Sequence, residues 1–165
     1  MKNINIRKLM SIAKKLNSKG KKWHFHILAP TCIFNPQKDK YAFILENVKD
    51  KHIFVSYSRK RYLKHGKELV KLIYGPSIIN NRYNKTRTTN RKIKTILGRA
   101  NRLNELDIEW EHHLLFPRCI FNKYKGKWCI VFEDPESNKI IECVYKHEPV
   151  VDLRAIEILY YQQKK

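Results

Sequence analysis

Two histidines, His26 and His113, are the residues of this chain whose type and position best suit chemistry. Each lies in a stretch rich in apolar and aromatic residues, and the two positions are 87 residues apart. Because imidazole exchanges a proton near neutral pH, the pair could act as general base and general acid on a phosphodiester. One alternative function is therefore a metal-independent phosphodiesterase or nuclease that uses both. The competing interpretation is structural, since a polar residue in an apolar strand is commonly hydrogen-bonded in the core.

Two cysteines follow the histidines at equal spacing and raise the question of a zinc site. Cys32 and Cys119 each come six residues after a histidine. Six residues of extended strand span about 20 Å, whereas zinc ligands lie about 2.0–2.3 Å from the ion, so His26 and Cys32 cannot share one ion unless Pro30 bends the chain sharply. None of the four cysteines forms a CxxC pair, and no GxGxxG or GxxxxGK[ST] motif is present. The sequence therefore predicts buried, reduced cysteines, no metal site and no cofactor.

Two carboxylates, Glu46 and Glu133, lie near the ends of predicted strands and are also 87 residues apart. If a hairpin forms soon after Asn35, Glu46 lies opposite Pro30, on the face of the strand that carries His26. Glu133 would repeat this arrangement. A carboxylate at this place could orient a histidine, bind a divalent ion or be solvated at the strand end, and all three roles stay open.

The segments around the two histidines resemble the 2H phosphoesterases over a few residues each. That family has a duplicated fold with two histidine motifs on strands, so the resemblance implies phosphodiester chemistry at His26 and His113. The family has Ser or Thr two places after each histidine, whereas this chain has Leu28 and Leu115. The hydroxyls that would hold the phosphate are therefore missing here.

Much of the chain repeats at the offset of 87 residues. Ten of the 20 residues from 16 to 35 are identical to their partners from 103 to 122. This period is longer than that of a solenoid repeat, so it indicates two copies of one larger supersecondary unit, which we expect to be related by a pseudo-twofold axis. The identical positions in the first copy are Leu16, Asn17, Trp23, His26, Leu28, Pro30 and all of 32–35.

The hydrophobic pattern gives the same order of elements in both copies. Apolar residues at helical spacing predict helices over 6–16 and 93–103. Aromatic and β-branched runs between polar loops then predict three strands in each copy, over 23–35, 41–48 and 52–58, and over 110–122, 128–133 and 139–145. Closing helices are predicted over 66–74 and 151–163.

These elements predict an α/β chain of the α+β type, built from an internally duplicated α-β-β-β-α unit. The expected architecture is two antiparallel three-stranded meanders flanked by helices, joined into one compact pseudo-dimeric domain. The predicted boundaries are 1–75 for the first unit, 76–90 for a basic linker and 91–165 for the second unit. The linker is assigned because this segment is rich in Asn and Thr and lacks apolar periodicity.

The positive charge of the chain is concentrated in its first part. Lys and Arg number 35 against 15 Asp and Glu, for a net charge of +20. Residues 1–75 hold 18 basic and 4 acidic side chains, 76–99 hold 7 and none, and 100–165 hold 10 and 11. A surface that only keeps a protein soluble would not need this confinement. The distribution therefore favours a polyanion bound to the first unit and the linker.

Nucleic acid, with RNA favoured over DNA, is the predicted partner, and its phosphates are the predicted point of contact. Alternatives are the nuclease named above and an interaction protein that docks on a ribonucleoprotein. No apolar run approaches the length of a membrane span, and a cytoplasmic location is expected. The predicted nucleic-acid-binding residues are Lys14, Lys15, Lys19, Lys21, Lys22, Arg59, Lys60, Arg61, Lys64, Arg82, Tyr83, Lys85, Arg87, Arg91 and Lys92.

Overall fold

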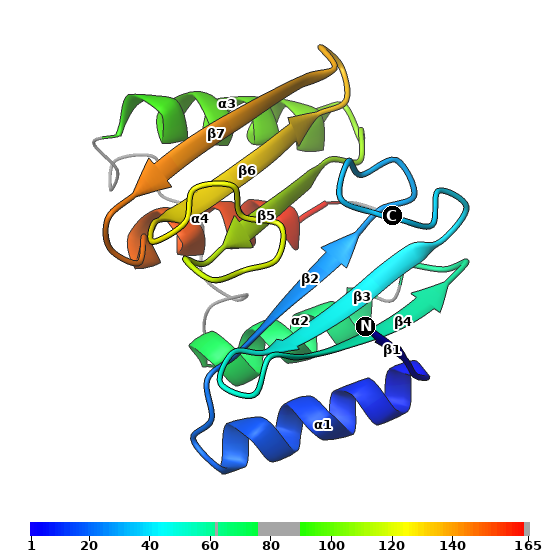
Figure 1. Cartoon of the computed structure of the whole chain (residues 1–165). Helices are drawn as coiled ribbons and strands as arrows, with labels where there is room; N and C mark the ends of the chain where they lie inside the picture. The colour runs from blue at the N-terminus through cyan, green and yellow to red at the C-terminus, as the bar shows by residue number, and fades with distance from the viewer. Residues whose placement is uncertain (62, 76–89, 164–165) are drawn as a thin grey trace. The chain divides into compact units, whose positions relative to one another are not determined.

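The chain folds as two α+β units, each with its own sheet. The computed structural model describes residues 1–61, 63–75 and 90–163, and the chain divides into unit 1, from Met1 to Pro76, and unit 2, from Ser77 to Lys165. The described residues form four helices and two sheets (Figure 1). None of these helices combines the length and apolarity that crossing a bilayer requires.

Unit 1 contains a four-stranded mixed sheet and two helices. Its elements are β1 (Lys2–Asn3), α1 (Ile6–Ser18), β2 (Trp23–Leu28), β3 (Tyr41–Asn47), β4 (His52–Ser58) and α2 (Leu63–Tyr74). The strand order is β1-β4-β3-β2, with β2, β3 and β4 antiparallel and β1 parallel to β4. The prediction of a purely three-stranded antiparallel meander is therefore wrong for this unit. A two-residue strand is too short to show the alternating pattern that reveals strands in a sequence.

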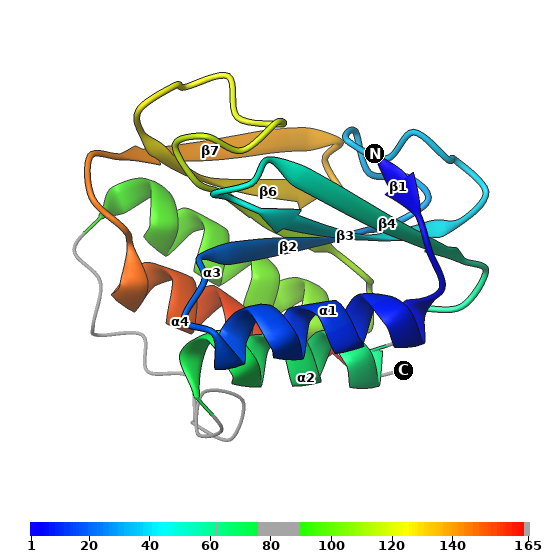
Figure 2. The ribbon, with the colours of Figure 1, turned by 60° about the horizontal axis from the view of Figure 1, so that its bottom comes forward.

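Helix α1 shows why the amphipathic pattern of unit 1 gives this layering. Its start is capped by Asn5, whose side-chain oxygen accepts a hydrogen bond of 2.8 Å from the backbone N–H of Lys8. One side of the helix is buried against the sheet in a core that includes Leu9, Phe43 and Leu45. Figure 2 shows α1 and α2 on the same face of this sheet. In the described part of unit 1, no helix lies on the opposite face of this sheet.

Unit 2 contains a three-stranded antiparallel sheet, as predicted, and two helices. Its elements are α3 (Arg91–Glu105), β5 (Glu111–Leu115), β6 (Trp128–Asp134), β7 (Lys139–Tyr145) and α4 (Val150–Tyr160), and the strand order is β5-β6-β7. Asn90 caps α3 by accepting hydrogen bonds from the backbone N–H groups of Lys92 and Ile93. Both helices cover one face of the sheet (Figure 2).

The first strand of each unit is shorter than the sequence predicts. The strands end at Leu28 and Leu115, and a compact loop takes the place of the predicted extension to residues 35 and 122. A proline without an N–H lies two residues after each strand end, and an asparagine closes the loop. The Asn35 Nδ2 group donates to the carbonyls of residues 28, 29 and 40 at 3.3, 2.8 and 2.7 Å. Asn122 does the same for residues 115, 116 and 127 at 3.3, 2.9 and 2.8 Å.

The strand registers of the two units also coincide at the offset of 87. In unit 1, Trp23 pairs with Asn47 and His24 pairs with Glu46. In unit 2, Glu111 pairs with Glu133, and these two residues stand 87 positions after His24 and Glu46. The expectation that Glu46 lies opposite Pro30 is therefore wrong. The loop over residues 29–40 is longer than the predicted turn, so the register moves, while Glu46 keeps the predicted face.

Candidate nucleic-acid interface

The first group of predicted basic residues lies on and just after α1. Because the apolar stripe of this helix is buried, its other side is exposed, and that side carries Lys14 and Lys15. Lys19, Lys21 and Lys22 are exposed in the connection from α1 to β2. The structure of unit 1 thus brings five predicted residues to one end of one helix.

Two of these five lysines are already engaged by carboxylates of unit 1. The Nζ atom of Lys14 lies 2.6 Å from Oε1 of Glu68, and the Nζ atom of Lys21 lies 3.3 Å from Oδ2 of Asp50. Hydrogen bonds from Lys21 and Asn47 lower the pKa of Asp50 below its usual value, so its charge persists in the pair. The other three lysines form no ion pair with any described residue. They are the stronger candidates for phosphate contacts.

The second predicted group follows β4. Arg59 and Lys60 are exposed, Arg61 is half-buried, and Lys64 is exposed in the first turn of α2. The backbone N–H of Lys60 donates to Oγ of Ser58 at 3.0 Å, which fixes the turn that leaves the strand. This end of β4 therefore presents cations on a defined backbone.

The linker residues Arg82, Tyr83, Lys85 and Arg87 lie outside the described part of the chain. Arg91 and Lys92 are exposed in the first turn of α3 and belong to unit 2. The Nζ atom of Lys92 donates to the carbonyl oxygen of Glu142 at 3.2 Å. Lys92 is therefore occupied within unit 2.

The predicted catalytic histidines each face a carboxylate of their own unit. His26 Nε2 lies 3.9 Å from Oε1 of Glu46, and His113 Nε2 lies 3.0 Å from Oε1 of Glu133. Both imidazoles are buried, with 1% of each side chain exposed. Each carboxylate sits diagonally across one strand pair from its histidine, on the sheet face without helices. Of the three roles considered for Glu133, the distance of 3.0 Å to His113 supports that of orienting the histidine.

Burial determines the protonation of His113. Loss of hydration lowers the pKa of this imidazole, and the hydrogen bond and charge of Glu133 oppose that shift without reversing it. The neutral ring then donates its Nε2 proton to the carboxylate. The pair has the features of a hydrogen-bonded core element, which was the structural interpretation of the histidines.

Unit 2 has a second buried polar pair, which the sequence pattern did not predict. His112 Nε2 lies 3.1 Å from Oε1 of Glu157 on α4. The residues 87 places earlier, Phe25 and Val70, are apolar. The signal that could have revealed this pair is that both positions are apolar in unit 1 and polar in unit 2. It joins β5 to the α4 helix.

Among the described residues of either unit taken alone, histidines, cysteines and carboxylates do not bring three ligand atoms together. Burial raises the pKa of Cys129 to about 12 and that of Cys143 to about 11, so both thiols stay protonated. These cysteines behave as small core residues.

Comparisons of this chain with protein-family models, with curated proteins and with solved structures give no match. Its function is therefore argued from its own residues.

Proposed function

We propose that this chain binds nucleic acid, with RNA preferred, and contacts phosphates through exposed cations of unit 1. The observation that carries the proposal is the lack of local compensation for the charge of this unit. Its 18 basic side chains face only 4 acidic ones. Of these, Glu46 is buried beside His26, and Asp50 and Glu68 are held in ion pairs. The remaining carboxylate, Asp39, lies 3.8 Å from Lys40.

Unit 2 gives the contrast that makes this charge informative. Its carboxylates engage its own cations: Arg99 contacts both Asp134 and Glu136, at 2.9 and 2.6 Å, and Lys123 lies 2.9 Å from Glu142. An even excess of lysine from composition alone would appear in both units. Unit 1 therefore has the surface that a polyanion would prefer.

Internal duplication is part of this proposal. The equal strand registers and the equal Asn35 and Asn122 hydrogen bonds support two copies of one α-β-β-β-α unit. In this account both copies kept the residues that build the fold, and only the first kept or gained a cationic surface. The pseudo-twofold relation between the copies stays a prediction.

Fluorescence anisotropy with labelled single-stranded RNA tests the proposal. The variant K15Q/K19Q/K22Q removes three exposed charges from unit 1, and K127Q/K139Q/K146Q removes three exposed charges from unit 2 as the matched control. Contacts to phosphates supply affinity, so the first variant should raise Kd about tenfold or more and the control about twofold at most. Equal losses in both variants, or no binding by the unaltered chain, would overturn the proposal.

The same experiment separates the alternative functions. A nuclease would shorten the RNA in the presence of a chelator, and His26→Gln or His113→Gln would abolish this while Kd stayed unchanged. A docking protein would bind an intact ribonucleoprotein far more tightly than free RNA. Intact RNA that is bound with a steep salt dependence is the result that the proposal expects.

A further inference from the structure

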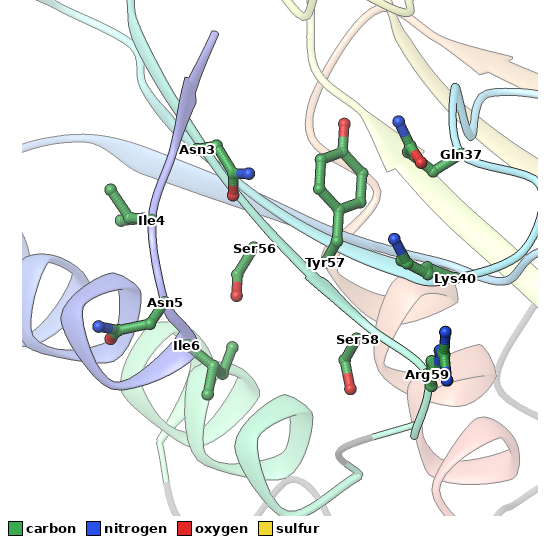
Figure 3. A pocket seen from close by; sticks show the side chains of 10 residues that line it. All are labelled: Asn3, Ile4, Asn5, Ile6, Gln37, Lys40, Ser56, Tyr57, Ser58 and Arg59. Carbon is green, nitrogen blue, oxygen red and sulfur yellow. The ribbon is translucent and has the colours of Figure 1, made fainter.

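Unit 1 has an open groove of about 790 Å³ beside the outer edge of β4. One wall is the segment from β1 into α1, another is the end of β4, and the loop before β3 supplies the rest (Figure 3). All of its lining residues belong to unit 1. They are Asn3, Ile4, Asn5, Ile6, Gln37, Lys40, Ser56, Tyr57, Ser58 and Arg59.

The lining suits an anion with polar edges. It combines amides and hydroxyls with the cations Lys40 and Arg59, and no carboxylate lines it. Figure 3 shows Lys40 on the side of the loop before β3 and Arg59 at the end of β4. Serine, asparagine, glutamine and tyrosine side chains commonly hydrogen-bond to phosphate oxygens, while lysine and arginine supply the charge.

Two serine hydroxyls of β4 line the groove. Ser56 is a buried residue and Ser58 is half-buried. Figure 3 shows both side chains on the same side of the strand. Because a hydroxyl can donate a hydrogen bond to a phosphate oxygen, these serines can contact an anionic ligand in the groove.

The edge of β4 is open over the same residues. Strand β1 pairs only with Phe54 and Val55, and the N–H of Ile4 donates to the carbonyl of Val55 at 2.8 Å. Beyond that point, residues 56–58 have no strand neighbour on this side among the described residues. The ring of Tyr57 projects from this edge on the side opposite the two serines (Figure 3). It offers a flat face next to the cations.

We propose that this groove holds a short stretch of single-stranded RNA, with a phosphate at Arg59 and Lys40 and a base stacked on Tyr57. The inference rests on the proposed function and gives it a defined site. Stacking on aromatic rings beside a cationic track is how single strands are bound without a sequence code. A duplex, whose bases are already stacked, would gain nothing from Tyr57.

Unit 2 supplies a natural comparison at the equivalent positions. Cys143, Val144 and Tyr145 stand 87 residues after the three lining residues of β4. The hydroxyl of Tyr145 donates to Asp152 at 2.9 Å, and Tyr124, the equivalent of Gln37, donates to Glu142 at 2.6 Å. Both tyrosine hydroxyls are therefore hydrogen-bonded to carboxylates of unit 2, and the charge of these nearby carboxylates would repel a phosphate. For this reason unit 2 should not bind the same ligand.

The test measures Kd for fluorescein-labelled U8, dT8 and a duplex of equal length. We expect Tyr57→Ala to raise Kd for U8 about tenfold and Tyr57→Phe to stay within about twofold of the unaltered chain, because Phe keeps the stacking face. Arg59→Gln should weaken binding and lower the slope of log K against log salt by about 0.7. The controls Val144→Ala and Lys146→Gln, at the equivalent positions of unit 2, should stay within about twofold.

The outcomes separate this site from the proposed function. If U8 binds and K15Q/K19Q/K22Q weakens it while Tyr57→Ala and Arg59→Gln do not, the groove is overturned and the proposed function stands. If the unaltered chain binds no nucleic acid, both fall. Tighter binding of dT8 or of the duplex than of U8 would overturn the assignment to single-stranded RNA. Far-UV circular dichroism of each variant, with Tyr57→Phe as the folded reference, shows whether a loss reflects unfolding.

Discussion

Units 1 and 2 share the pairing of three antiparallel strands and differ in charge. Their strands pair in the same register, and their loops are closed by the same asparagine hydrogen bonds. Their acidic residues are distributed very differently, since 1–75 hold 4 and 100–165 hold 11. Because unit 2 forms the same three-strand pairing with a different charge, that pairing does not depend on the charge of unit 1. The difference between the units is therefore where function should be sought.

The largest expected effect tests the feature that the units share. Asn35→Ala or Asn122→Ala would leave three carbonyl groups without their amide donor, and two of these carbonyls belong to buried residues in each unit. We expect each change to reduce the free energy of unfolding by about 2–4 kcal/mol. Chemical denaturation measures this, with Asn101→Ala as control, because the half-buried side chain of Asn101, among the described residues, donates only to Glu105 within α3. An effect in one unit only would break the equivalence of the two loops.

A smaller effect tests where the cores differ. Glu157→Val alone leaves the buried His112 ring without its carboxylate partner, and we expect a loss of about 1–3 kcal/mol. The double variant H112F/E157V places at these positions the apolar residues that stand 87 positions earlier in unit 1, Phe25 and Val70. It should recover most of that loss, because replacing both members of a buried pair by apolar residues is often neutral. If the double variant is less stable than the single one, the two cores are not interchangeable.

The pH dependence of stability tests the buried histidine of unit 2. The pKa of His113 is lower in the folded chain than in the unfolded one, so the unfolded state takes up the proton first as the pH falls. The contribution of His113 to the free energy of unfolding is complete above about pH 6.5, which is the pKa of histidine in the unfolded chain. Below that pH the contribution is lost, by at most about 1.4 kcal/mol per pH unit. His113→Gln should flatten the fall in unfolding free energy between pH 7 and pH 5. An unchanged slope would contradict the burial of a neutral imidazole.

The smallest effect compares two adjacent lysines of α1. Lys14 is paired with Glu68, whereas Lys15 has no carboxylate partner among the described residues. Lys15→Gln should therefore raise Kd for RNA about twofold, and Lys14→Gln should raise it less. Anisotropy titrations of the two variants side by side measure the difference. A larger loss for Lys14→Gln would show that the ion pair opens when RNA binds.

Several elements were predicted correctly because their physics is local. The stripe of Leu9, Ala13 and Leu16 fixes α1, and the bounds 52–58 and 139–145 of two predicted strands are those observed. The first strands were extended too far because their apolar residues continue into the loop, where the amide of Asn35 outweighs strand pairing. That error in loop length also gave Glu46 the wrong partner.

The candidate site was predicted less completely than the fold. Charge counting placed cations in unit 1, but Lys14 and Lys21 meet carboxylates from α2 and from the turn after β3, and only folding brings these together. The groove combines three separate segments around a strand edge left open by β1. Ser56, Gln37 and Asn3 carry no motif, so no pattern in the sequence could have grouped them.

The salt dependence of RNA binding tests the central claim most directly. If the unpaired cations of unit 1 contact about five phosphates, log K should fall against log salt with a slope of about −3.5. The K15Q/K19Q/K22Q variant should lower the steepness of that slope by about 2, and K127Q/K139Q/K146Q should leave it unchanged. A slope near zero for the unaltered chain, or an equal change in both variants, would contradict binding through unit 1.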